Sequence, residues 1–318
     1  MLNFLYCFDS NYNTQACVSI YSLLENVSEK INIYIIHDKY SDDNNFPEKI
    51  KNHPNLENFT ITKFKEEFSS FPNLKNVHIS QATYFRLFMS KYLPKDIQNI
   101  IYLDSDIICF SNFLSSLNLE IKNLESSDYI LAANTEFRSG IPNVINVFEE
   151  LNLKSSKYFN AGVLIINMRE WRNQNVEKYL LDILSTKNYF RYWDQDVMNL
   201  YFDGFYMEIP DDFNYRVRLI KSNLLDNISQ GKSPKPFFIH FCGAVKPWDM
   251  RSIILFKDSE IYQRYFRYIG QSFYHVNVKP ISLFFKNIFN LFTKSKFFNF
   301  YNKKLLFVSI LLNLKKQT

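Results

Sequence analysis

The stretch "NIIYLDSDIICF", residues 99 to 110, places two carboxylates inside an otherwise apolar run. Asp104 and Asp106 are separated only by Ser105. Burying one unpaired carboxylate is costly, and a second one nearby raises the cost. The apolar residues predict a buried strand over 99–104 whose end carries the aspartates. Residues i and i+2 of a strand point the same way, so both carboxylates would face one point, where a divalent cation would offset their repulsion. The alternative, an ordinary polar turn, is not excluded by this short motif.

Strand and helix patterns alternate along the first 250 residues. We predict strands at 3–8, 31–37, 57–62, 99–104, 129–134, 161–167 and 236–241, and helices at 12–27, 80–93, 168–184 and 194–202. Such alternation indicates an α/β fold with a mainly parallel sheet buried on both faces. Ligands of such sheets bind beyond the carboxyl ends of the strands. Asp9, Asp104, Asn134 and His240 each end a predicted strand, so we expect them to converge on one crevice.

Composition narrows the class of protein. The 318 residues are 47% apolar, which is typical of a globular chain with a sizeable core. The six glycines form neither a dinucleotide-binding nor a P-loop motif. The four cysteines form no C-x-x-C pair, so we expect buried, reduced thiols of a cytosolic protein. The first residues are expected to form a core strand and not a signal peptide, and no apolar run is long enough to span a bilayer.

Charge is divided unevenly between the body and the end of the chain. From Ile261 onward there are ten Lys and Arg residues and no Asp or Glu, whereas residues 1–260 carry a net charge of −5. Residues 281–292 place Ile281, Phe284, Phe285, Ile288, Phe289 and Phe292 on one helical face, with Lys286, Asn287 and Asn290 off it. A basic, aromatic helix is typical of a segment that lies on an anionic membrane. The alternatives are a helix that covers the body and a nucleic-acid-binding tail, but aromatics at helical spacing indicate a packed stripe and not a base-stacking platform.

Three further blocks carry residues suited to binding or chemistry. In "FFIHFCGAVKPW" (237–248), His240 ends a strand, Gly243 allows a tight loop and Lys246 supplies a positive charge that suits a diphosphate. In "KYFNAGVLIINMREWR" (157–172), Asn160 precedes a small-residue kink where the backbone can approach a ligand. Each residue also has an ordinary structural interpretation, as a core histidine or a turn asparagine.

The third block, "WDQDVMNLYFDG" (193–204), opens a predicted helix with polar side chains. Asp194 is expected to cap the helix, and Asp196 would be favoured by the helix dipole in the first turn. Capping does not explain Gln195.

Together these blocks resemble glycosyltransferase family 8, in particular its bacterial lipooligosaccharide α-galactosyltransferase and glucosyltransferase branch. The matching segments, in family order over about residues 1–250, are "FDSNYNTQACVSIYSLLEN", "ATYFRLFMSKYLP", "IIYLDSDIICF", "YFNAGVLIINMREWR", "DQDVMNLYF" and "HFCGAVKPW". The resemblance implies a GT-A fold, a Rossmann-like mixed sheet flanked by helices. It implies a catalytic domain over 1–250 and leaves 251–318 as a helical, basic and aromatic C-terminal segment.

The resemblance also implies roles for individual residues. Metal ligands would be Asp104, Asp106 and His240, holding Mn²⁺ or Mg²⁺ against the diphosphate of a UDP-galactose or UDP-glucose donor. Contacts to the donor would come from Cys7, Asp9, Asn11, Arg86, Ser105, Asn160, Asp194, Gln195, Gly243 and Lys246. Glu136 stands where the family often has Asp, so its role is the least directly transferred.

The implied reaction is hexosyl transfer with retention to a glycan or glycolipid, at the inner face of the bacterial inner membrane. The candidate catalytic residues are Asp194, Gln195 and Asp196. Asp196 is the candidate nucleophile, but no feature of the sequence requires a carboxylate in that role. We therefore favour a same-face mechanism in which the acceptor attacks from the side where UDP leaves. A metal-dependent sugar-nucleotide hydrolase or nucleotidyltransferase also uses D-x-D and is the alternative enzyme class. No nucleic-acid partner is expected.

Overall fold

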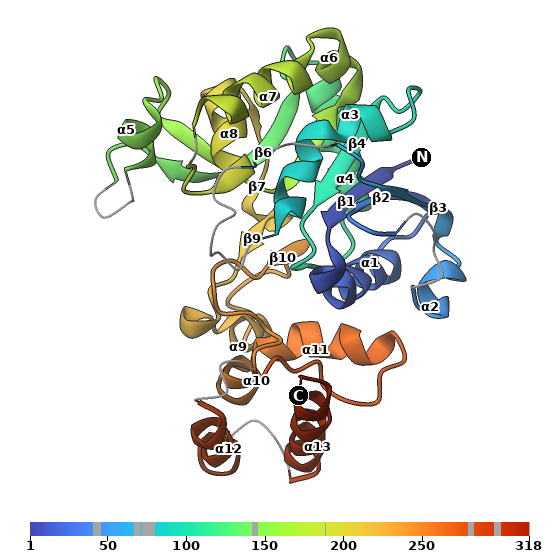
Figure 1. Cartoon of the computed structure of the whole chain (residues 1–318), viewed down its shortest axis with the longest axis vertical. Coiled ribbons are helices and arrows are strands. Elements are labelled where there is room, and N and C mark those ends of the chain that lie inside the picture. The colour runs from blue at the N-terminus through green and yellow to red at the C-terminus, as the bar shows by residue number, and fades with distance from the viewer. Residues whose placement is uncertain are drawn as a thin grey trace.

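The computed structural model describes residues 1–40, 46–66, 71, 80–141, 146–187, 189–278, 283–295 and 300–317. Its centre is a seven-stranded sheet in the order β3-β2-β1-β4-β7-β6-β8 (Figure 1). The strands of this sheet are β1 (Asn3–Phe8), β2 (Ile31–His37), β3 (Leu56–Lys63), β4 (Asn99–Leu103), β6 (Leu131–Arg138), β7 (Lys157–Asn167) and β8 (Met207–Glu208). A second sheet has three strands, β5 (Ile107–Cys109), β10 (Phe238–His240) and β9 (Tyr215–Arg216).

Helices flank the sheet and form the end of the chain. In the body they are η1 (Ser10–Tyr12), α1 (Asn13–Asn26), α2 (Glu48–Lys51), η2 (Gln81–Phe88), α3 (Met89–Tyr92), α4 (Leu114–Glu125), α5 (Val147–Leu151), α6 (Met168–Asn173), α7 (Val176–Thr186), α8 (Trp193–Phe202), η3 (Asp211–Phe213), η4 (Leu219–Lys221) and α9 (Leu224–Ser229). The C-terminal helices are α10 (Met250–Leu255), α11 (Ser259–Tyr268), α12 (Phe284–Thr293) and α13 (Phe300–Gln317).

The large sheet is mixed, as the family resemblance implied. Strand β1 is parallel to both β2 and β4, whereas β7 lies antiparallel between β4 and β6. Alternation of strands and helices alone had predicted a mainly parallel sheet. That prediction did not identify β7 as antiparallel, because the sequence of a strand buried on both faces is a continuous apolar run whichever way the strand is directed.

Alternate residues of the central strands enter two separate cores. On β1, Phe4 and Tyr6 belong to the core beneath α1 and α4, whereas Leu5 and Cys7 belong to the core beneath η2 and α6–α8. Burial on both faces explains why β1 reads as a continuous apolar run, and it confirms the sequence interpretation of a sheet covered by helices on both sides.

Two predicted helices differ from the observed ones. Residues 80–93 form a 3-10 segment, η2, followed by the short α3, which ends before Pro94 as predicted. The single helix predicted over 168–184 is two helices, because Asn175 adopts φ +51° between α6 and α7. A left-handed residue cannot continue an α-helix, and asparagine tolerates that conformation better than most residues.

The C-terminal helices pack in two ways. Helix α11 lies against α1 and contributes Ile261 and Tyr262 to the first core. Helices α10, α12 and α13 form a separate apolar cluster at one end of the molecule's long axis (Figure 1). Among the described residues, none of the helices has the length and hydropathy needed to cross a membrane.

Helix α12 departs from its predicted orientation. Its first predicted residue, Ile281, lies outside the described residues. The sequence placed Asn287 and Asn290 off the apolar face, yet both are buried, while Phe285 and Phe289 are 84% and 65% exposed. The broad apolar face is therefore divided between the interior and the surface.

Candidate active site

The two aspartates lie in the turn that joins the two sheets. Strand β4 ends at Leu103, one residue earlier than predicted, and β5 begins at Ile107. The amide of Asp104 donates to the carbonyl of Gly162 on β7 (2.9 Å), which fixes the start of the turn. Asp104 and Asp106 thus do not share a strand face, and their convergence comes from the turn.

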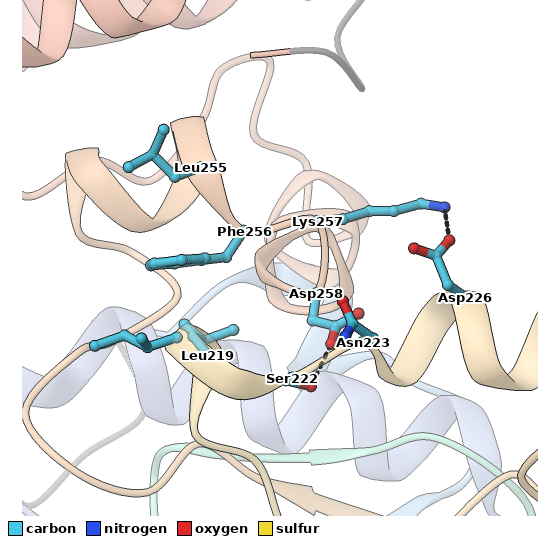
Figure 2. Close-up of a pocket in the computed structure, with 9 residues that line it drawn as sticks. Leu219, Ser222, Asn223, Asp226, Leu255, Phe256, Lys257 and Asp258 are labelled. Carbon is cyan, nitrogen blue, oxygen red and sulfur yellow. Dashed lines mark hydrogen bonds and ion pairs between the residues drawn. The ribbon is translucent and has the colours of Figure 1, made fainter. Parts of the chain in front are cut away.

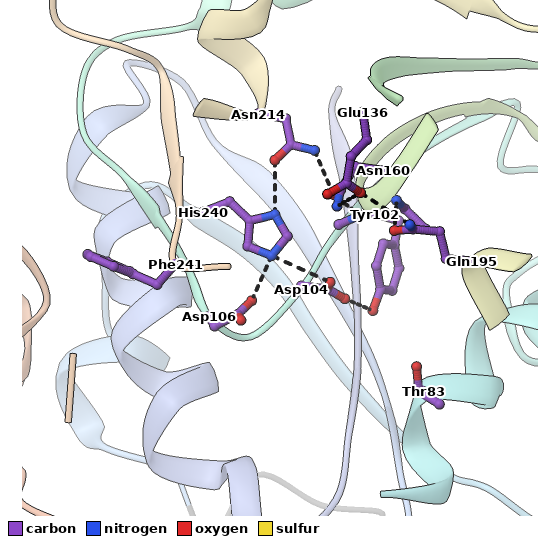
Figure 3. Close-up of polar contacts among 12 residues, drawn as sticks. Thr83, Tyr102, Asp104, Asp106, Glu136, Asn160, Gln195, Asn214, His240 and Phe241 are labelled. Carbon is purple, nitrogen blue, oxygen red and sulfur yellow. Dashed lines mark hydrogen bonds and ion pairs between the residues drawn. The ribbon is translucent and has the colours of Figure 1, made fainter. Parts of the chain in front are cut away.

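Strand pairing brings His240 to the same point. The imidazole ends β10, which pairs with β5 so that His240 lies opposite Ile107. His240 Nε2 lies 3.3 Å from Asp106 Oδ1 and 4.0 Å from Asp104 Oδ2 (Figure 3). One ligand atom from each of the three residues lies within 4.8 Å of the others. Two carboxylates and an imidazole fit a divalent cation such as Mn²⁺ or Mg²⁺.

Lys246 provides a positive charge beside this cluster. Its Nζ lies 2.6 Å from Asp106 Oδ2 and also donates to the carbonyl of Phe241 (2.8 Å). Burial opposes ionisation of Asp106, but Lys246 and His240 outweigh it and hold the pKa of Asp106 well below its usual range. Burial also opposes the imidazolium, yet Cys242 and Asp106 raise the pKa of His240 well above its usual range. Asp106 is therefore ionised at neutral pH.

Arg86 holds the other aspartate. The guanidinium donates to Asp104 Oδ1 (2.7 Å) and to the Ala161 carbonyl (2.6 Å), and its Nε lies 3.0 Å from Asp194 Oδ2. It also stacks on the ring of Tyr102, whose hydroxyl donates to Asp104 Oδ1 (2.7 Å). A buried arginine with this many partners is a rigid element of the site.

A network of amides and one carboxylate continues from the metal cluster. Asn160 Nδ2 donates to Glu136 Oε2 (2.9 Å), and Gln195 Nε2 donates to the same oxygen (3.2 Å). Gln195 Oε1 accepts from the Ala161 amide (2.9 Å). The structure thus brings Glu136, Asn160 and Gln195 together beside Asp104 (Figure 3).

Of the two aspartates of α8, Asp196 lies in the first turn as predicted, whereas Asp194 does not cap the helix. Tyr192 occupies the N-cap position of α8, and Asp194 makes no capping bond. Asp194 instead bonds to Thr83 and pairs with Arg86, and burial raises its pKa to about 6. Asp196 accepts from the Tyr158 hydroxyl (2.6 Å) and from the Tyr192 amide (2.9 Å), so each of its oxygens has a protein partner.

Some of the remaining predicted site residues line a cleft over the β4–β5 turn, whereas Asn11 and Gly243 are not among its lining residues. Its lining includes Cys7, Asp9, Arg86, Asp104, Ser105 and Asp106, and its volume is about 150 Å³. The hydroxyl of Ser105 is buried without a hydrogen-bond partner. Asn11 is exposed and bonds to Asp9 Oδ2 (3.0 Å), and Gly243 adopts φ +86° in the loop after β10.

Asn134 is a correction to the sequence prediction. It does not end a strand but lies within β6, opposite Asn160. Its amide donates to Asp211 (2.7 Å) and its oxygen accepts from Arg216. These contacts join the large sheet to η3 and β9. Asn134 therefore has a structural role, because it holds these segments against the large sheet.

A second hollow of about 400 Å³ lies between η4–α9 and the α10–α11 connection (Figure 2). Its acidic groups have structural partners: Asp258 accepts from the amides of Leu224 (2.8 Å) and Leu225 (2.9 Å), and Asp226 pairs with Lys257 (2.5 Å). This hollow lacks the convergence of ionisable groups found at Asp104 and Asp106.

Sequence reasoning missed Tyr102, Thr83 and Asn214. Tyr102 stands within the apolar run of β4 and reads as core, although its hydroxyl reaches Asp104. Asn214 follows η3 and contacts both His240 and Asn160 (2.9 Å each). The segment "DDFNYR" around it has no periodicity that would distinguish Asn214 from a turn residue.

Comparison with known proteins agrees with this site. Residues 3–251 match the family model "Glycosyl transferase family 8". The chain is 30% identical to the lipopolysaccharide 1,2-glucosyltransferase of Escherichia coli K12, over 78% of this chain and 72% of that one. It is 26% identical to the lipopolysaccharide 1,3-galactosyltransferase of Salmonella typhimurium, over 77% and 72%. The crystal structure of the galactosyltransferase LgtC with donor and acceptor sugar analogs has the same fold, with a TM-score of 0.69, 22% identity and coverage of 85% and 97%. The chain therefore belongs to glycosyl transferase family 8 and is a glycosyltransferase with the mixed α/β GT-A fold.

Proposed function

We propose that this enzyme moves galactose or glucose from a UDP-sugar to a glycan, in the synthesis of lipopolysaccharide or lipooligosaccharide. The observation that supports it most is the convergence of Asp104, Asp106 and His240 beside Lys246, with both aspartates lining a cleft. Relatives named as lipopolysaccharide glucosyl- and galactosyltransferases support the choice of acceptor. In this proposal residues 1–250 form the catalytic domain and 251–318 the C-terminal segment.

Asp104, Asp106 and His240 would hold Mn²⁺ or Mg²⁺, which would neutralise charge that develops on the departing diphosphate. Lys246 adds a cationic donor on the same side, and Gly243 leaves its loop backbone free of a side chain. Lys246 is paired with Asp106. When a diphosphate binds, the lysine can exchange its contact with the Asp106 carboxylate for one with a phosphate oxygen.

Other residues of the site would hold the donor. Contacts to uridine and ribose would come from the cleft residues Cys7, Asp9 and Ser105 and from Asn11, which bonds to Asp9. Contacts to the hexose would come from Arg86, Glu136, Asn160, Asp194 and Gln195. Glu136 joins Asn160 and Gln195 in one network, which supports its proposed role beside them.

The surroundings of Asp196 support retention by a same-face mechanism. A nucleophilic carboxylate needs an oxygen directed at the anomeric carbon, but Asp196 directs its oxygens at Tyr158 and Tyr192. Gln195 is a poor nucleophile. The acceptor hydroxyl would then attack from the side on which UDP departs, with a phosphate oxygen as the base.

UDP release tests this function directly. UDP-galactose and UDP-glucose are offered with Mn²⁺, with and without a glycan acceptor, and again with EDTA. We expect acceptor-dependent, EDTA-sensitive release and product with the anomeric configuration of the donor. UDP release at the same rate with and without the acceptor would indicate a hydrolase. A trapped glycosyl-enzyme on Asp196, detected by mass spectrometry, would contradict the same-face mechanism.

The C-terminal segment would place the enzyme on the inner face of the bacterial inner membrane. Phe285, Phe289 and Phe292 follow one another along α12 and are 84%, 65% and 52% exposed. Lys286 and Lys294 are exposed on and directly after the same helix. With ten basic residues and no acidic ones from Ile261 onward, this surface complements anionic lipid headgroups. The four free cysteines suit a cytoplasmic location.

Flotation with vesicles tests this placement. The wild-type enzyme is expected to float with anionic vesicles more than with neutral ones. Phe285→Ser with Phe289→Ser should reduce flotation several-fold. Phe273→Ser, at a side chain that is 39% exposed outside α12, is the matched control. Equal flotation of all three proteins would refute the membrane role, and concentration-dependent dimerisation lost in the double variant would indicate a second copy as the occupant.

A further inference from the structure

Asn214 lies between the metal cluster and the residues that would hold the donor sugar. Its side chain is 1% exposed. Asn214 Oδ1 lies 2.9 Å from His240 Nδ1, and Asn214 Nδ2 donates to Asn160 Oδ1 (2.9 Å) (Figure 3). The site residues predicted from the sequence do not include Asn214, which comes from the segment after η3.

Hydrogen bonds link His240 to Asn214 and Asn214 to Asn160. Which group donates in each of them is determined by the partners of Asn160. Asn160 Oδ1 accepts from the backbone amide of Gly162 (3.0 Å), which can only donate. On its other side Asn160 Nδ2 faces the carboxylate of Glu136, which when ionised can only accept. The orientation of the Asn160 amide is therefore fixed from both sides.

The orientation of the Asn160 amide determines the orientation of the Asn214 amide, and through it the protonation of the imidazole. Because Asn160 presents an oxygen, Asn214 must present its NH₂ group to it and its own oxygen to His240. The nitrogen that faces this oxygen, His240 Nδ1, must then carry a proton. The neutral imidazole that can ligate a metal ion then has its lone pair on Nε2, the nitrogen that faces Asp104 and Asp106.

We propose that Asn214 is a positioning residue that holds His240 in the metal-ligating tautomer and couples metal binding to the grip on the donor sugar. This inference rests on the proposed metal-dependent function. Partners that fix the second ring nitrogen of a ligating histidine typically affect metal affinity about 10- to 100-fold. The same amide also donates to Asn160 Oδ1, so loss of Asn214 removes a hydrogen-bond partner from both halves of the site.

Two substitutions separate these halves. Asn214→Ala removes both bonds. Asn214→Asp keeps an oxygen that accepts from His240 Nδ1 but places a second oxygen against Asn160 Oδ1, where two acceptors repel. Asn167→Ala is the control, because Asn167 is buried like Asn214 but lies at the end of β7 away from Asn160, where it caps α6 by accepting from the amide of Glu170 (3.1 Å).

The experiment measures binding and not turnover. Mn²⁺ binding is followed by electron paramagnetic resonance, and UDP and UDP-hexose affinities are measured by calorimetry with Mn²⁺ present. Asn214→Ala should weaken Mn²⁺ binding about 10- to 100-fold. Asn214→Asp should keep Mn²⁺ affinity near wild type but lose roughly 2- to 10-fold in the preference for UDP-hexose over UDP, as expected for one disturbed hydrogen bond. Asn167→Ala should change neither.

The outcomes are distinguishable. Wild-type Mn²⁺ affinity in a folded Asn214→Ala protein would overturn this inference and leave the proposed function intact. Equal loss of Mn²⁺ affinity in Asn214→Ala, Asn214→Asp and the Asn167→Ala control would also overturn it, because the effect would then be general destabilisation. Absence of Mn²⁺ binding by the wild-type protein would overturn the metal assignment together with the inference.

Discussion

Gly162→Ala is the substitution whose effect the geometry defines most sharply. A Cβ atom at this position would lie 2.4 Å from His240 Cε1 and 2.7 Å from His240 Nδ1. Contacts this short are about 1 Å inside van der Waals separation. The backbone of Gly162 cannot retreat easily, because it lies in β7 and its carbonyl accepts from the amide of Asp104 (2.9 Å). The imidazole must therefore move.

A shift of that size matters because metal ligation tolerates only about 0.2 Å in ligand distance. We expect Gly162→Ala to weaken Mn²⁺ binding by about 10- to 100-fold, the range seen when a ligating histidine loses its support. Overpacking should also lower the free energy of unfolding by about 1–3 kcal/mol. Mn²⁺ titration followed by electron paramagnetic resonance and urea unfolding without metal measure the two effects.

A double-mutant cycle with His240→Ala identifies the cause. Removing the imidazole relieves the contact, so Gly162→Ala should cost much less stability in the His240→Ala background than in the wild type. The neighbouring Asn160 Oδ1 lies 3.0 Å from the position that the added methyl group would occupy, which leaves a small residual cost. An equal cost in both backgrounds, or undiminished Mn²⁺ affinity in Gly162→Ala, would refute the reasoning.

Three further predictions concern the charged groups. Arg86→Lys keeps the charge but not the divergent contacts to Asp104 and Asp194, so kcat/KM for UDP release should fall roughly 10- to 100-fold; an unchanged value would contradict the assigned role. Burial raises the pKa of Asp194 to about 6 from 3.8, so the folded state binds more protons than the unfolded state between these values and stability falls as pH rises. Relative to Asp194→Asn, wild-type unfolding free energy should drop by about 3 kcal/mol between about pH 4 and 7, and a flat or rising difference in urea titrations would count against it. Lys246→Met removes the cation that competes for Asp106, so calorimetry should show tighter Mn²⁺ binding but weaker UDP binding; weaker binding of both would argue against this competition.

The strands that form the site were predictable because burial imposes a simple pattern. Strands β1 and β2 begin and end at the predicted residues, since each is an apolar run bounded by polar residues. The D-x-D motif could be singled out because apolar residues flank it on both sides, and His240 because it ends an apolar run just before Gly243 and Lys246. The three residues indeed converge.

What the sequence could not provide was the direction and partner of each strand. An apolar run does not reveal that β7 is antiparallel or that β5 and β10 form a separate sheet. Asp194 illustrates the same limit for side chains: an aspartate at a helix start predicts a cap, but Arg86, distant in sequence, pairs with it instead. Asn214 could not be recognised for the same reason, because its importance arises only from two neighbours that are distant in sequence, His240 on β10 and Asn160 on β7.

The division into two sheets explains how two like charges can stand within an apolar run. Residues 100–103 are buried in the large sheet and residues 107–109 in the small one, so the run is not a single strand interrupted by charges. The turn between them is the point where the chain leaves one sheet and enters the other, and it borders the cleft. Each carboxylate then meets a cation from its own side, Arg86 for Asp104 and Lys246 for Asp106. The apolar flanks therefore have a function in the site, because they anchor the charged turn in both sheets. Carboxylates that are already held in place lose little conformational freedom when they bind a cation.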